Sequence, residues 1–315
     1  MLKERETWVD NLKVFGILAV ILGHISSPPQ VFIFTWHMPL FFVISGFFID
    51  TLDTPIRFIK KGLYRLMLPY LVFTFLALFV ESLKRYLLGR ESLDYSSELY
   101  NMYVWMDGAA LVNTYAFVLW FLPALFFSRL VVYYACKYIS NIYMQTLTVI
   151  LLFSVSFFSD IPFAIDNALN SVLFVYIGFK IFYLYSKGLL NFKKAYYFLM
   201  PLLILWVIYL FYNFPGLDMA RKNYNNIPIN IAWSLLVILV LFYLSNKLNI
   251  TSRVLNEWAK NTMFIFAIHP YTNNIADAFV KLAMTQGWYV KFAISIVILQ
   301  VLIILKKKLN LFKYV

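Results

Sequence analysis

Ten apolar runs, each close to the length that crosses a lipid bilayer, constrain this chain of 315 residues more than any other feature. A transmembrane helix needs roughly 20 mostly apolar residues, and about 17–25 are accommodated by tilting. Because lipid offers the backbone no hydrogen-bond partner, such runs must fold as helices. The sequence therefore predicts an all-α integral membrane protein, a bundle of about ten transmembrane helices. The runs lie at about residues 10–27, 31–49, 65–81, 115–135, 142–159, 167–185, 195–214, 227–245, 261–280 and 287–305.

The composition excludes an ordinary soluble domain. Hydrophobic residues make up 62% of the chain and charged residues 13%, whereas soluble domains have roughly 45–50% and 25%. A single soluble core cannot bury that much apolar surface, but lipid removes the need to do so. No linker, low-complexity tract or internal repeat interrupts the helical pattern. We expect one membrane domain over residues 1–315, with no appended soluble domain.

The net charge of +12 raises the question of a nucleic-acid partner, but the distribution of the charge indicates a membrane topology instead. If the N-terminus is cytoplasmic, ten crossings return the C-terminus to the same side. All but seven of the 27 basic residues then fall on the cytoplasmic side, as the positive-inside rule expects. We therefore expect both termini in the cytoplasm, lipids as partners and no nucleic acid. The seven on the outer side are Lys84, Arg85, Arg90, Arg221, Lys222, Lys281 and Lys291.

The first apolar run, in the segment WVDNLKVFGILAVILGHIS, carries ionisable residues at membrane depth. Such residues are costly in lipid and by default indicate function. Lys13 and His24 are eleven residues apart, so they lie on nearly the same helical face, separated along the axis by roughly 16 Å. Asp10 and Lys13 are i,i+3 neighbours and can neutralise each other. The alternative is an interfacial lysine that snorkels and a histidine that ends a helix.

A second histidine follows in the segment FTWHMPLFFVISGFF. His37 lies thirteen residues after His24, across a short turn with two prolines, so the hairpin places both imidazoles at the same depth. Imidazole titrates near neutrality and can accept a proton from a hydroxyl group. Ser45 and Gly46 permit close contact between helices. No Cys, Glu or Asp nearby completes a metal-ligand set, so we predict no metal site.

A basic cluster occupies the expected entrance to the third span, in the segment RFIKKGLYRLMLPY. Lys61 and Arg65 are i,i+4 neighbours, and together with Lys13 they can hold a polyanion that enters from the cytoplasm. The positive-inside rule alone explains Arg57 well. It explains Arg65 less well, because that residue already lies inside the apolar run before Pro69.

Three further residues have two interpretations each. Trp120, in VLWFLPALF, either lines the interior of the bundle or faces lipid. Arg129, on the inner half of the fourth span, either assists the binding of the polyanion or only marks topology. His269, in FAIHPY, directly precedes Pro270 and either approaches the other two histidines or caps a broken helix.

Together these segments resemble the acyltransferase-3 family of membrane proteins, and more narrowly its fucose-4-O-acetylase-like branch. The resemblance covers essentially the whole chain, and its most specific motifs lie in the first 70 residues. Family members are typically ten-helix proteins that move an acyl group from cytoplasmic acyl-CoA to a glycan or a lipid-linked sugar. The residues that carry the resemblance are Arg5, Trp8, Asp10, the Lys13-x10-His24 spacing, and the blocks WHMPLFFVISGFF, KGLYRLMLP, VLWFLPALF, VYIGF and FAIHPY.

The resemblance implies roles for the residues singled out above. His24 would be catalytic with His37 supporting it, and Lys13, Lys61 and Arg65 would contact the phosphates of CoA. The family usually has an arginine where this chain has Lys13. His24 would act either as a general base or through a covalent acyl-histidine, and the sequence leaves both routes open.

We therefore predict a membrane-embedded O-acyltransferase, most simply an O-acetyltransferase, with acetyl-CoA as co-substrate and no permanently bound cofactor. Its acceptor would be a sugar hydroxyl of a cell-surface polysaccharide or of the lipid-linked precursor, in the cytoplasmic membrane of a bacterium. The alternatives are an O-succinyltransferase of the same family and a glycan transporter without acyl transfer, since intramembrane charges also mark transport paths. Homo-oligomerisation stays open.

Overall fold

The computed structural model describes residues 6–190, 196–212, 216–282 and 287–309, and within these ranges the chain is helical and forms no strand. Four of the described helical segments are long and apolar enough to cross a membrane: Pro55–Leu87, Ile165–Ser186, Ile227–Leu248 and Trp288–Lys308. The all-α fold is thereby confirmed, and its long apolar helices are those of a membrane protein. The total of about ten crossings and the side on which the termini lie stay predictions. Arg5 and the two ends of the run 195–214 lie outside the described residues.

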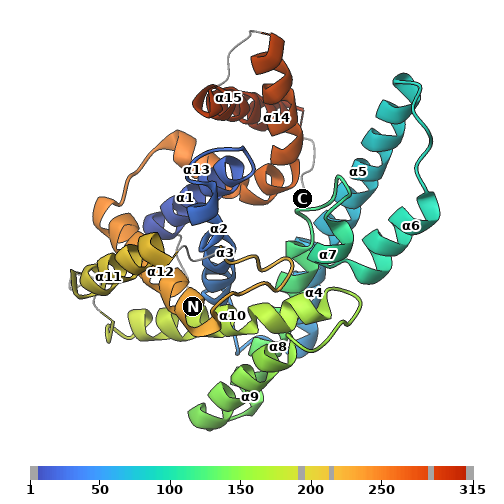
Figure 1. The fold of residues 1–315 in the computed structure, drawn as a ribbon. Helices are drawn as coiled ribbons and strands as arrows, with labels where there is room; N and C mark the ends of the chain where they lie inside the picture. Colours follow the sequence, from blue (N-terminus) through green and yellow to red (C-terminus); the bar gives the residue numbers. More distant parts are fainter. Residues whose placement is uncertain (1–5, 191–195, 213–215, 283–286, 310–315) are drawn as a thin grey trace.

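The helices follow the apolar runs in chain order and can be traced by colour in Figure 1. Two of them, written η, are wound as π-helix. Their bounds are α1 Thr7–Gly23, α2 Gln30–Phe34, α3 His37–Gly46, α4 Pro55–Gly62, η1 Leu63–Met67, α5 Leu68–Leu87, α6 Tyr95–Tyr100, η2 Asn101–Trp105, α7 Gly108–Leu111, α8 Phe121–Tyr138, α9 Ile142–Val155, α10 Ile165–Ser186, α11 Tyr196–Tyr212, α12 Ile227–Leu248, α13 Arg253–Lys260, α14 Thr262–Leu282 and α15 Trp288–Lys308.

The second predicted span is broken where a continuous helix was expected. Helix α2 ends at Phe34, and α3 begins at His37. The break is stabilised from α12, because Trp233 donates its indole N–H to the Thr35 hydroxyl at 2.8 Å and the Ser234 hydroxyl donates to the Thr35 carbonyl. Backbone groups freed by a break at membrane depth need such partners.

The third span is longer than predicted, because α4, η1 and α5 form one continuous helix over residues 55–87. The π-helical turn Leu63–Met67 has a local cause. Pro69 has no N–H to donate to the carbonyl of Arg65, four residues earlier, so the regular ladder is interrupted there. The same extension shortens the expected outer connection 82–114, in which α6, η2 and α7 are themselves helical. Helix α8, in contrast, begins at Phe121, later than the predicted residue 115.

Helix α3 crosses α10 at the centre of the bundle, and this crossing depends on two glycines (Figure 1). A Cβ atom on Gly46 would lie 2.2 Å from the Val175 carbonyl oxygen, and one on Gly178 would lie 2.0 Å from the Val43 carbonyl oxygen. Only glycine lets the two backbones approach this closely. The expected close contact at Ser45–Gly46 therefore occurs through Gly46, while the Ser45 hydroxyl donates to the Phe42 carbonyl at 2.7 Å within α3.

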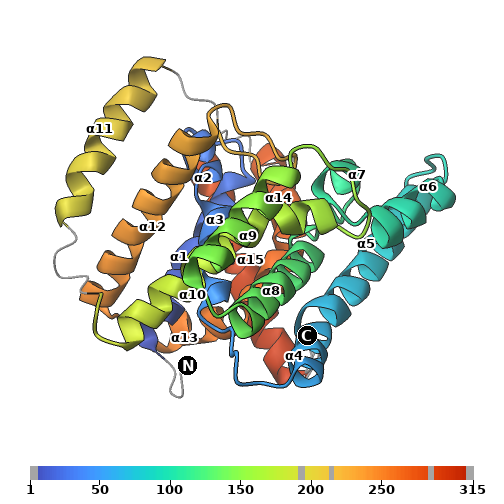
Figure 2. The same ribbon diagram turned by 90° about the horizontal axis from the view of Figure 1, so that it is seen from below.

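The outer faces of the peripheral helices are apolar. Helix α5 exposes residues at four-residue spacing, and in Figures 1 and 2 this helix leans away from the bundle on one side while α11 stands at the opposite edge against α12. An exposed apolar stripe of this length is suited to contact with hydrocarbon. The exposed residues of the α5 stripe are Leu71, Phe75, Phe79, Leu83 and Leu87.

Candidate functional site

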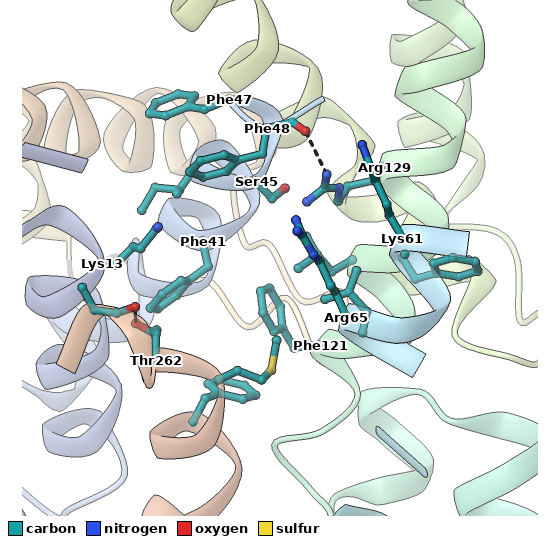
Figure 3. A pocket seen from close by; sticks show the side chains of 18 of the residues that line it. Lys13, Phe41, Ser45, Phe47, Phe48, Lys61, Arg65, Phe121, Arg129 and Thr262 are labelled. Carbon is teal, nitrogen blue, oxygen red and sulfur yellow. Dashed lines mark hydrogen bonds between the residues drawn. The ribbon is translucent and has the colours of Figure 1, made fainter. Parts of the chain in front are cut away.

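A cavity of about 530 Å³ opens between α1, α3, α4, α8 and the α13–α14 corner, and we call it the basic cavity (Figure 3). Phenylalanine side chains form much of its wall. Its charged lining is strongly unbalanced, since five cationic side chains face one carboxylate, that of Asp53. The cations are Lys13, Lys61, Arg65, Arg129 and Lys260.

Asp53 fixes one edge of the basic cavity. It is 8% exposed, accepts from the Lys61 ammonium at 2.6 Å and lies 3.3 Å from the Arg57 guanidinium. Its backbone carbonyl accepts from the Tyr133 hydroxyl at 2.6 Å and from the Lys137 ammonium at 2.6 Å. The carboxylate is thus held in place, and it offsets part of the charge of Lys61.

Two other cations are positioned by backbone and aromatic groups. Arg129 donates from Nη2 to the Phe48 carbonyl at 3.1 Å, and its guanidinium lies 5.7 Å from the centre of the Phe58 ring. The Lys13 ammonium lies 4.8 Å from the centre of the Phe48 ring and 3.4 Å from the Asp10 carboxylate. Cation–π contacts of this kind stabilise a charge by about 0.5–2 kcal/mol without neutralising it. Arg129 is therefore held without an ion pair among the described residues, whereas the Asp10 carboxylate offsets part of the charge of Lys13.

Arg65 and Lys260 are the uncompensated cations of the basic cavity. Both are exposed, and neither makes an ion pair or a side-chain hydrogen bond to any of the described residues. Arg65 belongs to the π-helical turn η1, and its side chain points into the cavity, toward the Arg129 guanidinium (Figure 3). Two guanidinium groups that share a cavity repel each other unless an anion lies between them. This side of the cavity is therefore suited to a phosphate group.

A second, smaller cavity of about 210 Å³ is lined by His24 and His37, and we call it the histidine cavity. Aromatic side chains and a polar turn complete the lining: Phe34, Phe117, Trp120, Phe266, and the turn from Leu217 to Arg221. The third histidine of the chain joins the other two from α14. The His24 ring lies 4.9 Å from the His269 ring and 6.3 Å from the His37 ring, measured between centroids.

Each of the three imidazoles donates Nδ1–H to a backbone carbonyl. The acceptors are Val20 for His24 at 2.8 Å, Ile33 for His37 at 2.9 Å and Phe266 for His269 at 2.7 Å. A carbonyl oxygen can only accept, so in the neutral imidazole Nδ1 carries the hydrogen and Nε2 carries the lone pair. All three rings are thus set to accept a proton at Nε2.

The acceptor carbonyls are available for local reasons. Val20 and Ile33 lie in the last turns of α1 and α2. Their carbonyls accept the backbone N–H of His24 and of Trp36, both at 3.2 Å, and the second lone pair of each oxygen is left for the imidazole. Phe266 lies four residues before Pro270, which lacks the N–H that would bond to it in a regular helix. A proline inside α14 therefore determines which nitrogen of His269 is protonated.

The three histidines differ in access. His24 is partly exposed, whereas His37 and His269 are 2% and 0% exposed. Nε2 of His269 is buried and has no hydrogen-bond partner among the described residues. A soluble group that enters the histidine cavity therefore meets His24, with the other two rings packed behind it.

The polar turn that borders the histidine cavity is held by buried contacts. Asn167 donates to the carbonyls of Met219 and Ala220, both at 3.2 Å, and accepts from the backbone N–H of Gly108 at 3.0 Å. Gly108 has no side chain because a Cβ there would lie 2.5 Å from the Ala220 carbonyl oxygen. The turn therefore presents Asp218 and Arg221 from a fixed backbone.

Lys222 provides the other anchor of this turn. Its ammonium lies 2.6 Å from the carboxylate of Asp166, which is itself buried, and 3.2 Å from that of Asp160. Burial lowers the pKa of Lys222, but the bonds to Asp166 and Asp160 outweigh it, so the pKa is raised. The lysine therefore stays charged at neutral pH.

The sequence-predicted residues fall into these two cavities. Lys13, Lys61, Arg65, Arg129 and Ser45 line the basic cavity, and Asp10 contacts Lys13 beside it. The histidine cavity contains His24, His37 and Trp120, with His269 packed against His24. Among the described residues, no group of three His, Cys, Asp or Glu is arranged to hold a metal ion.

Among the lining residues that sequence reasoning missed, five matter for the argument below: Asp53, Lys260, Phe266, Asp218 and Arg221. The interruption that Pro270 makes in α14 was visible in the sequence and could have drawn attention to Phe266, four residues earlier. The other four carry no local signal, because what distinguishes them is contact with residues remote in the chain.

The model of the acyltransferase-3 family, described as an acyltransferase domain, matches residues 6–305. The chain belongs to the acyltransferase-3 family. It is thus a membrane acyltransferase, and the family match spans the helices that build both cavities. The narrower resemblance to the fucose-4-O-acetylase-like branch stays a prediction.

No curated protein and no solved structure matched this membrane acyltransferase. The roles of its individual residues are therefore argued below from the geometry of the two cavities.

Proposed function

We propose that this acyltransferase transfers an acetyl group from cytoplasmic acetyl-CoA to a sugar hydroxyl of a cell-surface polysaccharide or its lipid-linked precursor. In this proposal it works in the cytoplasmic membrane of a bacterium. The observation that carries the proposal is that α1 joins a cationic cavity to a histidine cavity. Lys13 lines the first and His24 the second, eleven residues and roughly 16 Å apart along the helix.

The basic cavity suits the donor. CoA carries its negative charge on phosphate groups at one end and its acyl group at the other, on a long and flexible pantetheine arm. Arg65 and Lys260 have no ion pair among the described residues and offer free charge to the phosphates. The phenylalanine-rich wall suits the uncharged arm. The distance from Lys13 to His24 is within the reach of that arm.

The histidine cavity suits the acceptor. Its aromatic side chains, among them Phe117 and Trp120, can stack on the apolar face of a sugar ring. Asp218 and Arg221 can exchange hydrogen bonds with the remaining hydroxyl groups, since both are partly exposed on the fixed turn. A few polar groups on an otherwise apolar wall are typical of sites that orient one ligand.

The reaction needs one base and one leaving group. Nε2 of His24 accepts the proton of the acceptor hydroxyl while the hydroxyl oxygen attacks the thioester carbonyl carbon. The carbon–sulfur bond then breaks, and the CoA thiolate takes up the proton that His24 holds. The products are an O-acyl sugar and free CoA. His37 and His269 hold His24 in place and stabilise the charge that His24 gains.

The test is acyl-CoA binding and turnover by the purified protein in detergent. Acetyl-CoA and succinyl-CoA are the donors, p-nitrophenyl glycosides are the acceptor probes, and His24→Ala is compared with the parent. We expect saturable acetyl-CoA binding in both proteins and a loss of transfer of about 100-fold or more in the variant.

Three outcomes would redirect the proposal. Preference for succinyl-CoA would make the protein an O-succinyltransferase. Transfer that survives His24→Ala would remove His24 as the base. Failure of the parent to bind or turn over either thioester would favour the transporter alternative.

A further inference from the structure

Phe266 occupies a position that no other residue of the two cavities shares. It lines the basic cavity and also lines the histidine cavity, and the other described lining residues belong to one cavity only. Its side chain therefore forms part of the wall that separates the two spaces.

The Phe266 ring is held on both sides of that wall. It is 4% exposed and lies 5.2 Å from the ring of Phe121, which lines the basic cavity. On the other side it lies 6.0 Å from the ring of His269, which contacts His24. Its own backbone carbonyl accepts the Nδ1–H of His269. The barrier and His269 thus belong to one turn of α14.

We propose that the Phe266 side chain is the barrier past which an acyl group must reach His24, and that it limits transfer to short acyl chains. This inference rests on the proposed function, since it assigns the two cavities to donor and acceptor. The ring contacts Phe121 and His269, so a long acyl chain would have to displace it further from these contacts than an acetyl group would. Packing at this density makes a difference of even one methylene measurable.

The same barrier protects the thioester from water. The basic cavity must be open enough to admit CoA, so it also admits water. By holding the thioester away from His24, the barrier slows an unproductive reaction in which His24 accepts a proton from water, the water oxygen attacks the thioester carbonyl, and CoA leaves with that proton. Transfer to a sugar is then favoured over hydrolysis.

The experiment measures CoA release from acetyl-, butyryl- and hexanoyl-CoA without any acceptor, with a thiol reagent, for the parent and Phe266→Ala. We expect the variant to hydrolyse acetyl-CoA faster than the parent and to raise the butyryl-to-acetyl ratio at least about tenfold. Adding His24→Ala to Phe266→Ala should remove the gain, since hydrolysis would still depend on that base.

Phe264→Ala is the matched control. Phe264 is another buried phenylalanine of α14, 7% exposed, but it lines neither cavity and packs instead near Phe73. Its loss should cost similar stability and leave the chain-length order unchanged. Acetyl-CoA binding, which depends on the basic cavity, checks that each variant is folded. If Phe266→Ala does not bind, Phe266→Leu gives the same readout with a smaller loss of volume.

The outcomes separate the two proposals. If Phe266→Ala binds acetyl-CoA but keeps the parent's hydrolysis rate and chain-length order, the proposal that Phe266 is a barrier is wrong. The acyltransferase assignment would not be affected. If neither the parent nor any variant binds or cleaves a thioester, both proposals fall together.

Discussion

The two cavities of this acyltransferase share the helices α1 and α3 and the side chain of Phe266, but they differ in almost every other respect. The basic cavity, at about 530 Å³, is lined by five cations, of which Arg65 and Lys260 have no ion pair among the described residues. The histidine cavity, at about 210 Å³, is lined by aromatic rings, two imidazoles and one fixed turn. The difference indicates that the basic cavity binds its ligand through charge and that the histidine cavity orients the reacting groups.

Side-chain contacts are divided in the same way. In the basic cavity, Arg65 and Lys260 make no ion pair or side-chain hydrogen bond to the described residues, so no such bond fixes their positions. Around the histidine cavity, all three rings are tied to backbone carbonyls, and the turn is tied to Asn167. A charged ligand tolerates an adaptable site, whereas proton transfer needs fixed distances.

Gly178→Leu should have the largest effect, because it acts on both cavities together. A side chain at this position would collide with the Val43 carbonyl and push α3 away from α10. Helix α3 carries His37 at one end and Ser45 at the other, so both cavities lose a wall. We expect overpacking to cost about 3 kcal/mol and to abolish both acetyl-CoA binding and transfer.

The measurement for Gly178→Leu is the yield of monodisperse protein in detergent together with acetyl-CoA binding. Gly188→Leu is a useful comparison for size alone, because a Cβ there meets no atom within 4 Å, although the positive φ of 69° adds some strain. Normal binding by Gly178→Leu would show that the α3–α10 crossing is not what holds the cavities together.

His37→Ala should lower the rate of transfer without changing the binding of acetyl-CoA. The ring is 2% exposed, lies 6.3 Å from His24 and does not line the basic cavity. We expect kcat for transfer to fall about 100-fold while the Kd for acetyl-CoA stays within about twofold of the parent. A rise in Kd of the same size as the fall in kcat would contradict the assignment of binding to the basic cavity and catalysis to the histidine cavity.

Arg65→Ala should show the converse pattern. Removing an unpaired guanidinium from the basic cavity should raise the Kd for acetyl-CoA about tenfold, which corresponds to about 1.4 kcal/mol, and leave kcat nearly unchanged. The salt dependence of binding should also become weaker, because one charge contact is gone.

Arg57→Ala is the matched control for Arg65→Ala. Arg57 is a nearby arginine that is already paired with Asp53 and does not line the basic cavity, so its loss should change Kd little. Equal effects of the two substitutions would mean that only the overall positive charge of the continuous helix over residues 55–87 matters.

Asp218→Asn should have the smallest effect and should act on the acceptor only. Asparagine keeps an oxygen that can accept from the backbone N–H groups of Ala220 and Arg221, at 3.0 and 3.2 Å in the parent. The turn is therefore preserved while the carboxylate charge is lost. We expect the KM for a glycoside acceptor to rise about threefold to tenfold, with the KM for acetyl-CoA unchanged. An unchanged acceptor KM would place the sugar elsewhere in the cavity.

Much of this molecule could be predicted from local patterns in the sequence. Apolar run length predicted the helices, and the short interval between His24 and His37 correctly predicted that the two rings lie close together. The break at Thr35 and Trp36 was not predictable, because the partners that stabilise it, Trp233 and Ser234, lie on α12. Helix periodicity contains no information about such remote partners.

The same limit applies to the site. The basic residues near Lys61 were found because they interrupt apolar runs, but the carboxylate of Asp53 that pairs with Lys61 looked like an ordinary loop residue. His269 was a candidate only by its depth in its span, and its 4.9 Å contact with His24 joins positions 245 residues apart. A single sequence shows which ionisable residues lie within apolar runs. Only the fold shows which of them are in contact.

The proline that follows His269 has a consequence for how this chain can evolve. Replacing Pro270 by a residue with an N–H would supply the Phe266 carbonyl with the helical donor it lacks, and the imidazole would no longer be needed there. Replacing His269 alone would leave that carbonyl short of a partner in a buried part of the bundle. Pro270 thus makes His269 necessary. Lineages that exchange the histidine should therefore also exchange the proline.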